Sequence, residues 1–407
     1  MQKKLAIIGG GATGFFAGIN TAEINPDLDV HIFEKGAAFL NKVKISGGGR
    51  CNVTNACYDP KELSENYPRG KKELLGPFYE FNPQHTIEWF EKRNVKLKTE
   101  EDGRIFPVSN SSQTIIDCFL TEAKKNNVKL HLQKGIRTIE AHKENKWKLD
   151  FLDASEFICD HLLIASGSSN QIWNCLQNIG HNILPPVPSL FTFNIKDNRI
   201  NELMGISVPV ANCAVVDTKI MTSGPLLITH WGLSGPAILK LSAWGARELH
   251  TKQYNFKLKI NFIPEYSYAT CFDFLHSLKK YIPKKTIQQT NELNLPSRLF
   301  KNLCQYCGIN EKLNWSDISK EKMQQLAETL TESIFEVNGK SNFKDEFVTC
   351  GGIDLREVDF KTMQSKMFPH LYFAGEVLNI DAITGGFNFQ AAWTTAYIAA
   401  VGISNDS

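Results

Sequence analysis

Hydrophobic positions at the start of the chain follow the pattern of a strand, a turn, a helix and a second strand. Residues 4–8 end in an uninterrupted apolar run, which is typical of a strand buried on both faces of a parallel sheet. Glycines within 9–14 predict the turn, residues 15–24 predict a helix that ends before Pro26, and residues 29–33 predict the second strand. Because parallel strands need a crossover connection, the pattern predicts a βαβ unit.

The rest of the chain continues this alternation and then departs from it. The next predicted elements are helices over 82–94 and 111–125, short strands near 128–132, 136–141 and 146–152, and a buried strand over 157–165. Three prolines within 185–188 should continue neither helix nor sheet, so they predict a domain boundary. Short strand patterns fill 189–262 and helical patterns fill 269–331, and a strand–turn–helix pattern returns from about 345.

These patterns predict an α/β protein with an insertion. The predicted domains are a discontinuous nucleotide-binding domain over 1–188 and 345–407, a β-rich domain over 189–265 and 332–344, and a helical domain over 266–331. The apolar run over 391–403 is shorter than the roughly 20 residues of a membrane-spanning helix, so it predicts a buried helix.

Composition excludes several classes of protein. The 407 residues include 45 Lys and Arg against 43 Asp and Glu, a formal charge of +2, which predicts neither a nucleic-acid partner held by bulk charge nor a membrane-surface protein. Hydrophobic residues at 42% and charged residues at 22% are typical of a globular chain. The ten cysteines are scattered, and the apolar run at the start is broken by glycine before a signal peptide could form, so we expect reduced thiols and a cytoplasmic protein.

The first glycine-rich turn has the spacing Gly9-x-Gly11-x-x-Gly14 between a strand and a helix. In that context the glycines allow a tight turn, the approach of a pyrophosphate and close packing of helix on strand. Glu34 follows Gly14 by 20 residues, at the end of the second strand, where a carboxylate accepts hydrogen bonds from a ribose. The alternative is a glycine-rich turn of another α/β fold. The predicted contacts are Gly9, Gly11, Ala12, Thr13, Gly14, Glu34 and Lys35.

A second glycine motif of this kind is absent from the sequence, whereas enzymes with separate FAD and nicotinamide domains usually carry two. We therefore expect FAD as the resident cofactor and NAD(P)H as a transient electron donor.

Residues 42–55 form a second glycine-rich segment, with three consecutive glycines followed by Arg-Cys-Asn. Consecutive glycines let the backbone approach a flat ligand, and positive charge near a flavin raises its electron affinity. The alternative is a flexible polar loop. The predicted contacts are Lys42, Ser46, Gly47, Gly48, Arg50, Cys51, Asn52 and Asn55.

Residues 375–390 repeat the strand–turn–helix arrangement near the end of the chain. Its helix N-terminus could direct N–H groups at the flavin, and its acidic side chains could bind the ribityl hydroxyls. The alternative is a turn in which glycine serves only packing. The predicted contacts are Gly375, Glu376, Asp381, Gly386, Phe387 and Asn388.

Taken together, these segments, with the motifs at 103–107 and 229–236, resemble the BaiN/YhiN-type flavoproteins, also described as aminoacetone-oxidase-like FAD-binding enzymes or NAD(P)/FAD-dependent oxidoreductases. The resemblance implies a Rossmann-like FAD-binding domain of glutathione-reductase type, made from both chain ends, with an inserted β-barrel-like domain and a small helical domain. It also implies that the backbone of Ile136 faces adenine and that the loop Ala165, Ser166 and Gly167 crosses near the flavin. The chain departs from the family pattern at four positions, Ser166, Ser168, Asn379 and Phe387.

Candidates for catalysis are weaker. His230 could donate a proton beside a flavin, Arg104 could bind a substrate carboxylate or phosphate, and Cys51 could contact the flavin or form a redox disulfide with Cys57. The alternative for each of these side chains is a purely structural role. Cys304 and Cys307 have metal-ligand spacing, but no second pair lies at a suitable distance, so we expect no metal.

These patterns predict a flavin-dependent oxidoreductase. FAD N5 would accept a hydride from NAD(P)H or from a small-molecule substrate and pass it to an organic acceptor or O2. The alternatives are a tRNA-modifying-type flavoprotein of the same fold and a non-catalytic FAD-binding redox sensor. The substrate and the oligomeric state stay open.

Overall fold

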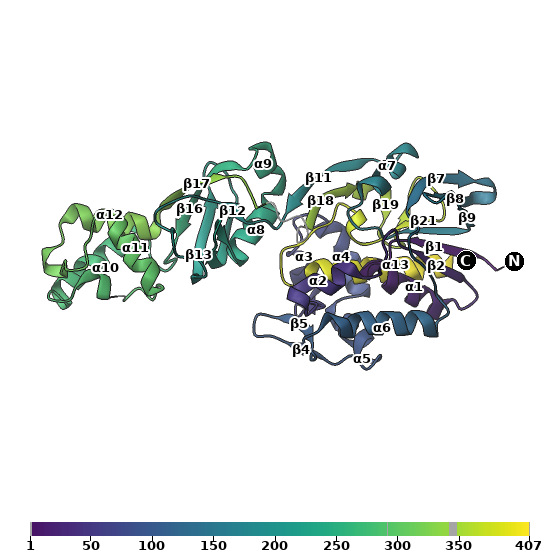
Figure 1. The fold of residues 1–407 in the computed structure, drawn as a ribbon, viewed down its shortest axis with the longest axis horizontal. Helices are drawn as coiled ribbons and strands as arrows, with labels where there is room; N and C mark the ends of the chain where they lie inside the picture. The colour runs from purple at the N-terminus through teal and green to yellow at the C-terminus, as the bar shows by residue number, and fades with distance from the viewer. Residues whose placement is uncertain (1, 291, 342–347, 407) are drawn as a thin grey trace. The chain divides into compact units, whose positions relative to one another are not determined.

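The computed structural model describes residues 2–290, 292–341 and 348–406. The chain forms two compact units: a first unit of residues 1–186 and 349–407, and a second unit of residues 187–348 (Figure 1). The division falls beside the predicted boundary at the prolines. Among the described residues, every helix is too short or too polar to cross a lipid bilayer.

The first unit is built on a seven-stranded sheet. Its strands, in spatial order, are β19 (Val358–Asp359), β20 (Gln364–Ser365), β21 (Leu371–Phe373), β10 (His161–Ile164), β1 (Lys4–Ile8), β2 (Asp29–Phe33) and β6 (Lys129–His131). The five strands from β21 to β6 are parallel. β1 is buried after its first residue and β10 along its whole length, as expected for strands covered on both faces. This arrangement confirms the predicted α/β class and the opening βαβ unit.

The helices α1 (Ala12–Ile24) and α13 (Phe387–Asn405) pack against each other in this unit (Figure 1). The ring of Trp393 on α13 is centred 5.2 Å from that of Phe16 on α1 and 5.7 Å from that of Phe119, a residue of the neighbouring helix α6 (Ser112–Lys125). α13 is buried along most of its length, which confirms the buried helix predicted at the end of the chain. The two ends of the chain thus share one hydrophobic core.

Two three-stranded sheets also belong to the first unit. β3 (Thr54–Asn55), β5 (Arg104–Pro107) and β4 (Leu97–Thr99) form one, and β7 (Ile136–His142), β8 (Lys146–Phe151) and β9 (Glu156–Cys159) form the other. Its remaining helices are α2 (Asn41–Gly49), α3 (Pro60–Ser64), α4 (Lys71–Glu80), α5 (Pro83–Glu91), α6 (Ser112–Lys125) and α7 (Asn170–Asn178).

The second unit contains a six-stranded antiparallel sheet with the spatial order β12 (Phe193–Asn194), β15 (Gly232–Ser234), β14 (Met221–Ile228), β13 (Ser207–Val215), β16 (Asn255–Asn261) and β17 (Ser333–Asn338). Its helices are α8 (Pro236–Trp244), α9 (Ala246–Thr251), α10 (Tyr268–Tyr281), α11 (Ser297–Tyr306) and α12 (Lys320–Thr331). One hydrophobic cluster runs from the sheet into these helices. The separate helical domain of the sequence analysis stays a prediction.

Two local predictions were wrong, and three helices were missed. The prolines at 185–188 lie within a strand, β11 (Ile183–Ser189), which pairs with β18 (Val348–Ile353) in a two-stranded sheet, and proline is tolerated at such a sheet edge. The apolar run over 157–165 divides into β9 and β10. The helices α2, α3 and α4 were not predicted, because glycine or proline obscures their hydrophobic periodicity.

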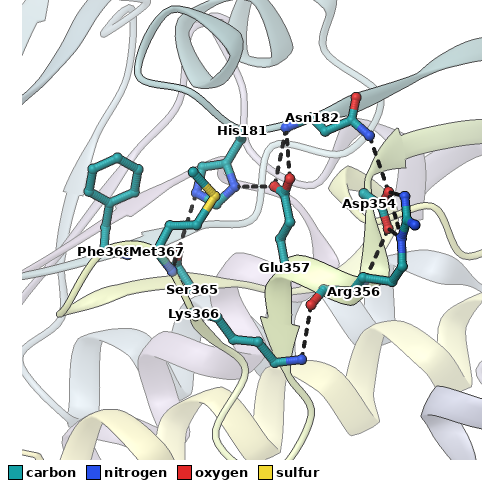
Figure 2. A network of polar contacts seen from close by, with 9 residues as sticks. All are labelled: His181, Asn182, Asp354, Arg356, Glu357, Ser365, Lys366, Met367 and Phe368. Atoms are coloured by element: carbon teal, nitrogen blue, oxygen red, sulfur yellow. Dashed lines mark hydrogen bonds and ion pairs between the residues drawn. The ribbon is translucent and has the colours of Figure 1, made fainter.

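A buried polar network holds the chain where it enters β11 (Figure 2). The side chain of His181 is fully buried, with Nδ1 2.7 Å from the carboxylate of Glu357 and Nε2 3.2 Å from the hydroxyl of Ser365. The backbone N–H of Asn182 donates to the same carboxylate. The Ser365 hydroxyl is itself buried and accepts two backbone N–H groups, so this serine–histidine–acid series is structural and not nucleophilic.

Removing the Glu357 carboxylate should destabilise the first unit. Glu357→Ala leaves the buried imidazole of His181 without its acceptor, and we expect the free energy of unfolding to fall by about 1–3 kcal/mol in chemical denaturation. The control is Glu336→Ala, which breaks an exposed ion pair with Lys257 and should cost less than about 1 kcal/mol. Equal losses in the two variants would contradict a special role for the network.

Candidate cofactor-binding site

The loops that follow β1, β10 and β21 meet at one edge of the parallel sheet. A Cβ atom added to Gly9 would lie 2.3 Å from the carbonyl oxygen of Ala165, and one added to Gly375 would lie 2.4 Å from Oγ1 of Thr13. Because the carboxyl ends of parallel strands share an edge, the three loops form one surface. The structure thus brings together the first glycine turn, the 165–167 loop and the start of the 375–390 segment.

The three glycines of the first turn have different surroundings. A Cβ atom at Gly14 would lie 2.0 Å from the carbonyl oxygen of Gly9, so Gly14 permits the contact between helix and turn. A Cβ atom at Gly11, by contrast, would meet no protein atom within 4 Å. Gly11 is also the N-cap of α1, and neither a capping side chain nor an acidic residue occupies the first turn of that helix. The helix N-terminus therefore presents N–H groups at a place open to a ligand.

Glu34 lies beside this turn at the end of β2. One carboxylate oxygen accepts the N–H of Gly10 at 2.9 Å, and the other accepts the N–H of Gly36 at 2.7 Å. Each oxygen keeps further acceptor capacity, so the side chain can both brace the turn and bind a hydroxyl. Lys35 follows Glu34 directly in the chain.

Ile136 lies on a segment that borders this turn. The N–H of Gln133 donates to the carbonyl of Gly36, which ties the approach to β7 to the end of β2. The backbone carbonyl of Ile136 accepts a hydrogen bond from the side chain of Gln171. The side chain of Ile136 is buried.

The second glycine segment forms the end of α2. Gly47, Gly48 and Gly49 all have positive φ angles, of 56°, 68° and 83°, and Ser46 before them is extended. Cβ atoms at Gly48 and Gly49 would meet nothing within 4 Å. The chain therefore leaves α2 through a run of left-handed residues, with an exposed backbone face open to a ligand.

Hydrogen bonds join this segment to the start of α13. The side-chain amide of Asn55 donates to the carbonyl of Gly385 at 2.9 Å, and the Thr54 hydroxyl donates to the side chain of Gln390 at 2.6 Å. A Cβ atom at Gly386 would lie 2.4 Å from the carbonyl oxygen of Thr54 and 2.9 Å from the amide oxygen of Asn52.

Other contacts close the loop before α13. The Asn388 side chain bonds both backbone groups of Ala382, and the carbonyl of Phe387 accepts the hydroxyl of Tyr67. All three predicted segments thus belong to one connected structure.

Three of the predicted charged contacts, Lys42, Arg50 and Glu376, form ion pairs within the protein. The ammonium of Lys42 lies 2.8 Å from the carboxylate of Glu376, and the guanidinium of Arg50 lies 2.7 Å from Glu100. The Arg50 guanidinium also lies 4.0 Å from the centre of the Phe106 ring. Lys42, Arg50 and Glu376 were predicted as ligand contacts, and no local pattern reveals these partners, because they are distant in sequence.

Asp381 is fully buried and forms an ion pair with Arg69 through both carboxylate oxygens. Sequence reasoning missed Arg69, which precedes α4 in a segment without a recognised motif. It also gave no role to Asn379, whose buried side-chain oxygen has no hydrogen-bond partner among the residues that the structure describes.

The weaker catalytic candidates lie in different surroundings. His230 is exposed on the turn between β14 and β15 of the second unit. The Arg104 guanidinium lies 2.7 Å from Asp102 and 3.3 Å from Glu100. Its charge is therefore already compensated.

Cys51 is fully buried, and burial raises the pKa of its thiol to about 12, although the Ser46 side chain acts in the opposite direction. Cys57 is partly exposed and likewise a free thiol, and its pKa is raised by burial and by Glu62 and Asp59. At neutral pH both groups are thus thiols and not thiolates.

Comparisons with known proteins bear on this site. The family model described as HI0933-like protein Rossmann domain matches residues 3–402. Over 97% of its length the chain is 30% identical to the ribosomal RNA dihydrouridine synthase of Escherichia coli strain K12, of which 96% is covered. Over 98% of its length it is 25% identical to the 3-dehydro-bile acid delta(4,6)-reductase of Clostridium scindens, of which 98% is covered.

A solved structure of 3-ketosteroid-delta4-(5alpha)-dehydrogenase from Rhodococcus jostii is similar in fold. It has a TM-score of 0.51 at 10% sequence identity, with 100% of this chain and 97% of that chain covered. A 3-ketosteroid delta1-dehydrogenase from Sterolibacterium denitrificans has a TM-score of 0.50 at 11% identity, with 100% of both chains covered.

Thiol labelling should separate the two cysteines of the site. Of the ten cysteines only Cys57 is partly exposed, and the nine others, Cys51 among them, are buried. We therefore expect iodoacetamide to modify Cys57 first in the native protein, and Cys51 at least about tenfold more slowly. Peptide mass spectrometry measures both sites, and Cys57→Ser provides the control that should lose the fast reaction. Rapid native labelling of Cys51 would contradict the buried thiol.

Proposed function

Because the chain belongs to the HI0933-like protein Rossmann-domain family, we propose that it is an FAD-dependent reductase of a carbon–carbon double bond conjugated to a carbonyl group. The match over residues 3–402 confirms the family resemblance that the motifs predicted. The observation that carries the cofactor assignment is the open backbone at Gly11, on an uncapped helix N-terminus beside the Glu34 carboxylate.

The residues present fit FAD. The N–H groups at the start of α1 would bind the pyrophosphate, since that helix end offers no side chain of its own to satisfy them. Glu34 would accept the ribose hydroxyls with its remaining lone pairs. The loops at 46–49, 165–167 and 375–388 would enclose the isoalloxazine. FAD, when bound, supplies an atom that can accept a hydride and donate it again.

Most polar contacts between the protein and the bound ligand would come from uncharged hydrogen-bond donors. Lys42, Arg50 and Asp381 are each paired with an opposite charge of the protein, so their net field at the ligand is small. Backbone N–H groups at the glycine turns and the start of α13 are then the main polar groups that face a ligand. Neither buried Cys51 nor charge-compensated Arg104 is suited to acid–base work in this arrangement.

The names of two relatives support the substrate class. Synthesis of dihydrouridine adds hydrogen across the 5,6 double bond of uracil, which is conjugated to a carbonyl, and a delta(4,6)-reductase of a 3-dehydro bile acid acts on a double bond conjugated to the 3-oxo group. We favour uridine in ribosomal RNA, because the relative named for it shares 30% identity over nearly the full length of both chains. The near-neutral charge predicted no nucleic-acid partner, so binding would depend on local contacts.

Reduction of the flavin followed by its reoxidation tests this proposal. Under anaerobic conditions NADH or NADPH should bleach the visible flavin band, and unmodified ribosomal RNA should restore it while dihydrouridine accumulates, measured by mass spectrometry. If a 3-oxo-4,6-diene steroid restores the flavin band and RNA does not, the substrate would be a small molecule and not RNA. Bleaching by dithionite alone, with no reoxidation by either acceptor, would contradict a nicotinamide-linked reductase.

Two glycine variants test the cofactor site itself. Gly11→Val should fold, because its side chain enters open space, but FAD affinity should fall at least tenfold, about 1.4 kcal/mol or more, since the side chain takes the place of the pyrophosphate. Gly14→Ala is the contrasting variant and should fail to fold, because its Cβ would overlap the carbonyl of Gly9. Circular dichroism and flavin titration measure the two effects. Full flavin retention in Gly11→Val would contradict the site.

A further inference from the structure

Three potential metal ligands gather at the opposite edge of the parallel sheet. They are His161 at the start of β10, His370 directly before β21, and Asp406 directly after α13. One ligand atom of each lies within 4.8 Å of those of the other two. The residues are far apart in sequence and form no spacing motif, which is why the sequence predicted no metal.

The backbone fixes the two histidines beside each other. β10 and β21 are parallel, with Leu162 paired to Leu371, and the N–H of Leu162 donates to the carbonyl of His370 at 2.9 Å. The two imidazole rings lie nearly perpendicular, at 85°, with their centres 5.0 Å apart. The strand register therefore fixes the backbone of His161 relative to that of His370, which lies in the turn before β21.

The distances suit a small ion with a modest adjustment. Nδ1 of His370 lies 2.7 Å from Oδ2 of Asp406, and Nδ1 of His161 lies 4.0 Å from the same oxygen. In a tetrahedral zinc site with bonds of 2.0–2.2 Å, ligand atoms are about 3.4 Å apart, between these two values. Asp406 follows the end of α13, where the side chain can shift without disturbing the core.

A neighbouring tyrosine orients the carboxylate. The hydroxyl of Tyr372 donates to Oδ2 of Asp406 at 2.6 Å. Hydrogen bonds of this kind to ligating carboxylates are common around metal sites and set the direction of the remaining lone pairs.

The cluster is closed on one side and open on the other. The side chain of His161 is 1% exposed, whereas those of His370 and Asp406 are 26% and 37% exposed. An ion could therefore enter from solvent and rest against a buried ligand. The titratable and charged groups that act on His161 are His370, Asp406, the ammonium of Lys3 and Asp160.

We propose that His161, His370 and Asp406 form a binding site for a divalent transition metal ion of the zinc type. Two imidazole nitrogens and one carboxylate oxygen are the donor set of three-ligand zinc sites, in which water takes the fourth position. The site is separate from the cofactor site, because β10 and β21 reach the metal cluster with their first residues and the cofactor loops with their last. A bound ion would tie the end of α13 to the sheet.

Zinc titration of the purified flavoprotein tests the site. In a Cys57→Ser background, which removes the partly exposed thiol, isothermal titration with ZnCl2 should show one saturable site per chain. His370→Ala and Asp406→Asn should each weaken zinc binding at least about tenfold, because loss of an outer-shell partner alone costs 10–100-fold. His142→Ala, at an exposed histidine of β7, should leave the affinity unchanged.

Flavin content and circular dichroism measured on each variant show whether it is folded. Should His370→Ala fail to fold, Tyr372→Phe keeps all three ligands and should weaken binding by removing the hydrogen bond to Asp406. No saturable zinc binding in the parent, or equal affinity in the parent, His370→Ala and Asp406→Asn, would overturn the proposal. Neither result depends on whether the flavin reduces a double bond.

Discussion

The close approach of backbone to backbone at the carboxyl edge of the parallel sheet is the constraint on which the first unit depends. At Gly9 and Gly14 an added Cβ would lie within 2.3 Å of a carbonyl oxygen, so the turn after β1 can pack against α1 and the 165–167 loop only without side chains. Gly11 differs, because its missing side chain serves no protein contact. The fold therefore requires glycine at positions 9 and 14, whereas only a bound ligand would require glycine at position 11.

Long-range pairing changes the electrostatics that the motifs suggest. Lys42 and Arg50 belong to one short segment, yet their carboxylate partners are Glu376 and Glu100. Each pair removes a net charge from the site and at the same time joins segments that are distant in sequence. The polar groups that stay open to a ligand at the glycine turns are therefore mainly backbone N–H groups.

The strands β10 and β21 connect two regions with different chemistry. Their last residues lead into the loops of the proposed flavin site, and their first residues lie at the histidine–aspartate cluster. α13 spans the same distance, from Gly386 beside the Thr54 carbonyl to Asp406 beside Tyr372. Between these two ends, α13 packs against α1.

The sequence by itself determined the opening βαβ unit, the buried C-terminal helix and the positions of the three glycine-rich segments, because hydrophobic periodicity and glycine spacing are local properties. The insertion at the prolines was also visible, although the strand through them was not, since an edge strand tolerates missing N–H groups. Only the tertiary structure decided that Asp381 faces Arg69, that Cys51 is buried, and that His161 and His370 lie side by side. The physical reason is that ion pairs, burial and strand order join residues up to hundreds of positions apart, and no local pattern records those contacts.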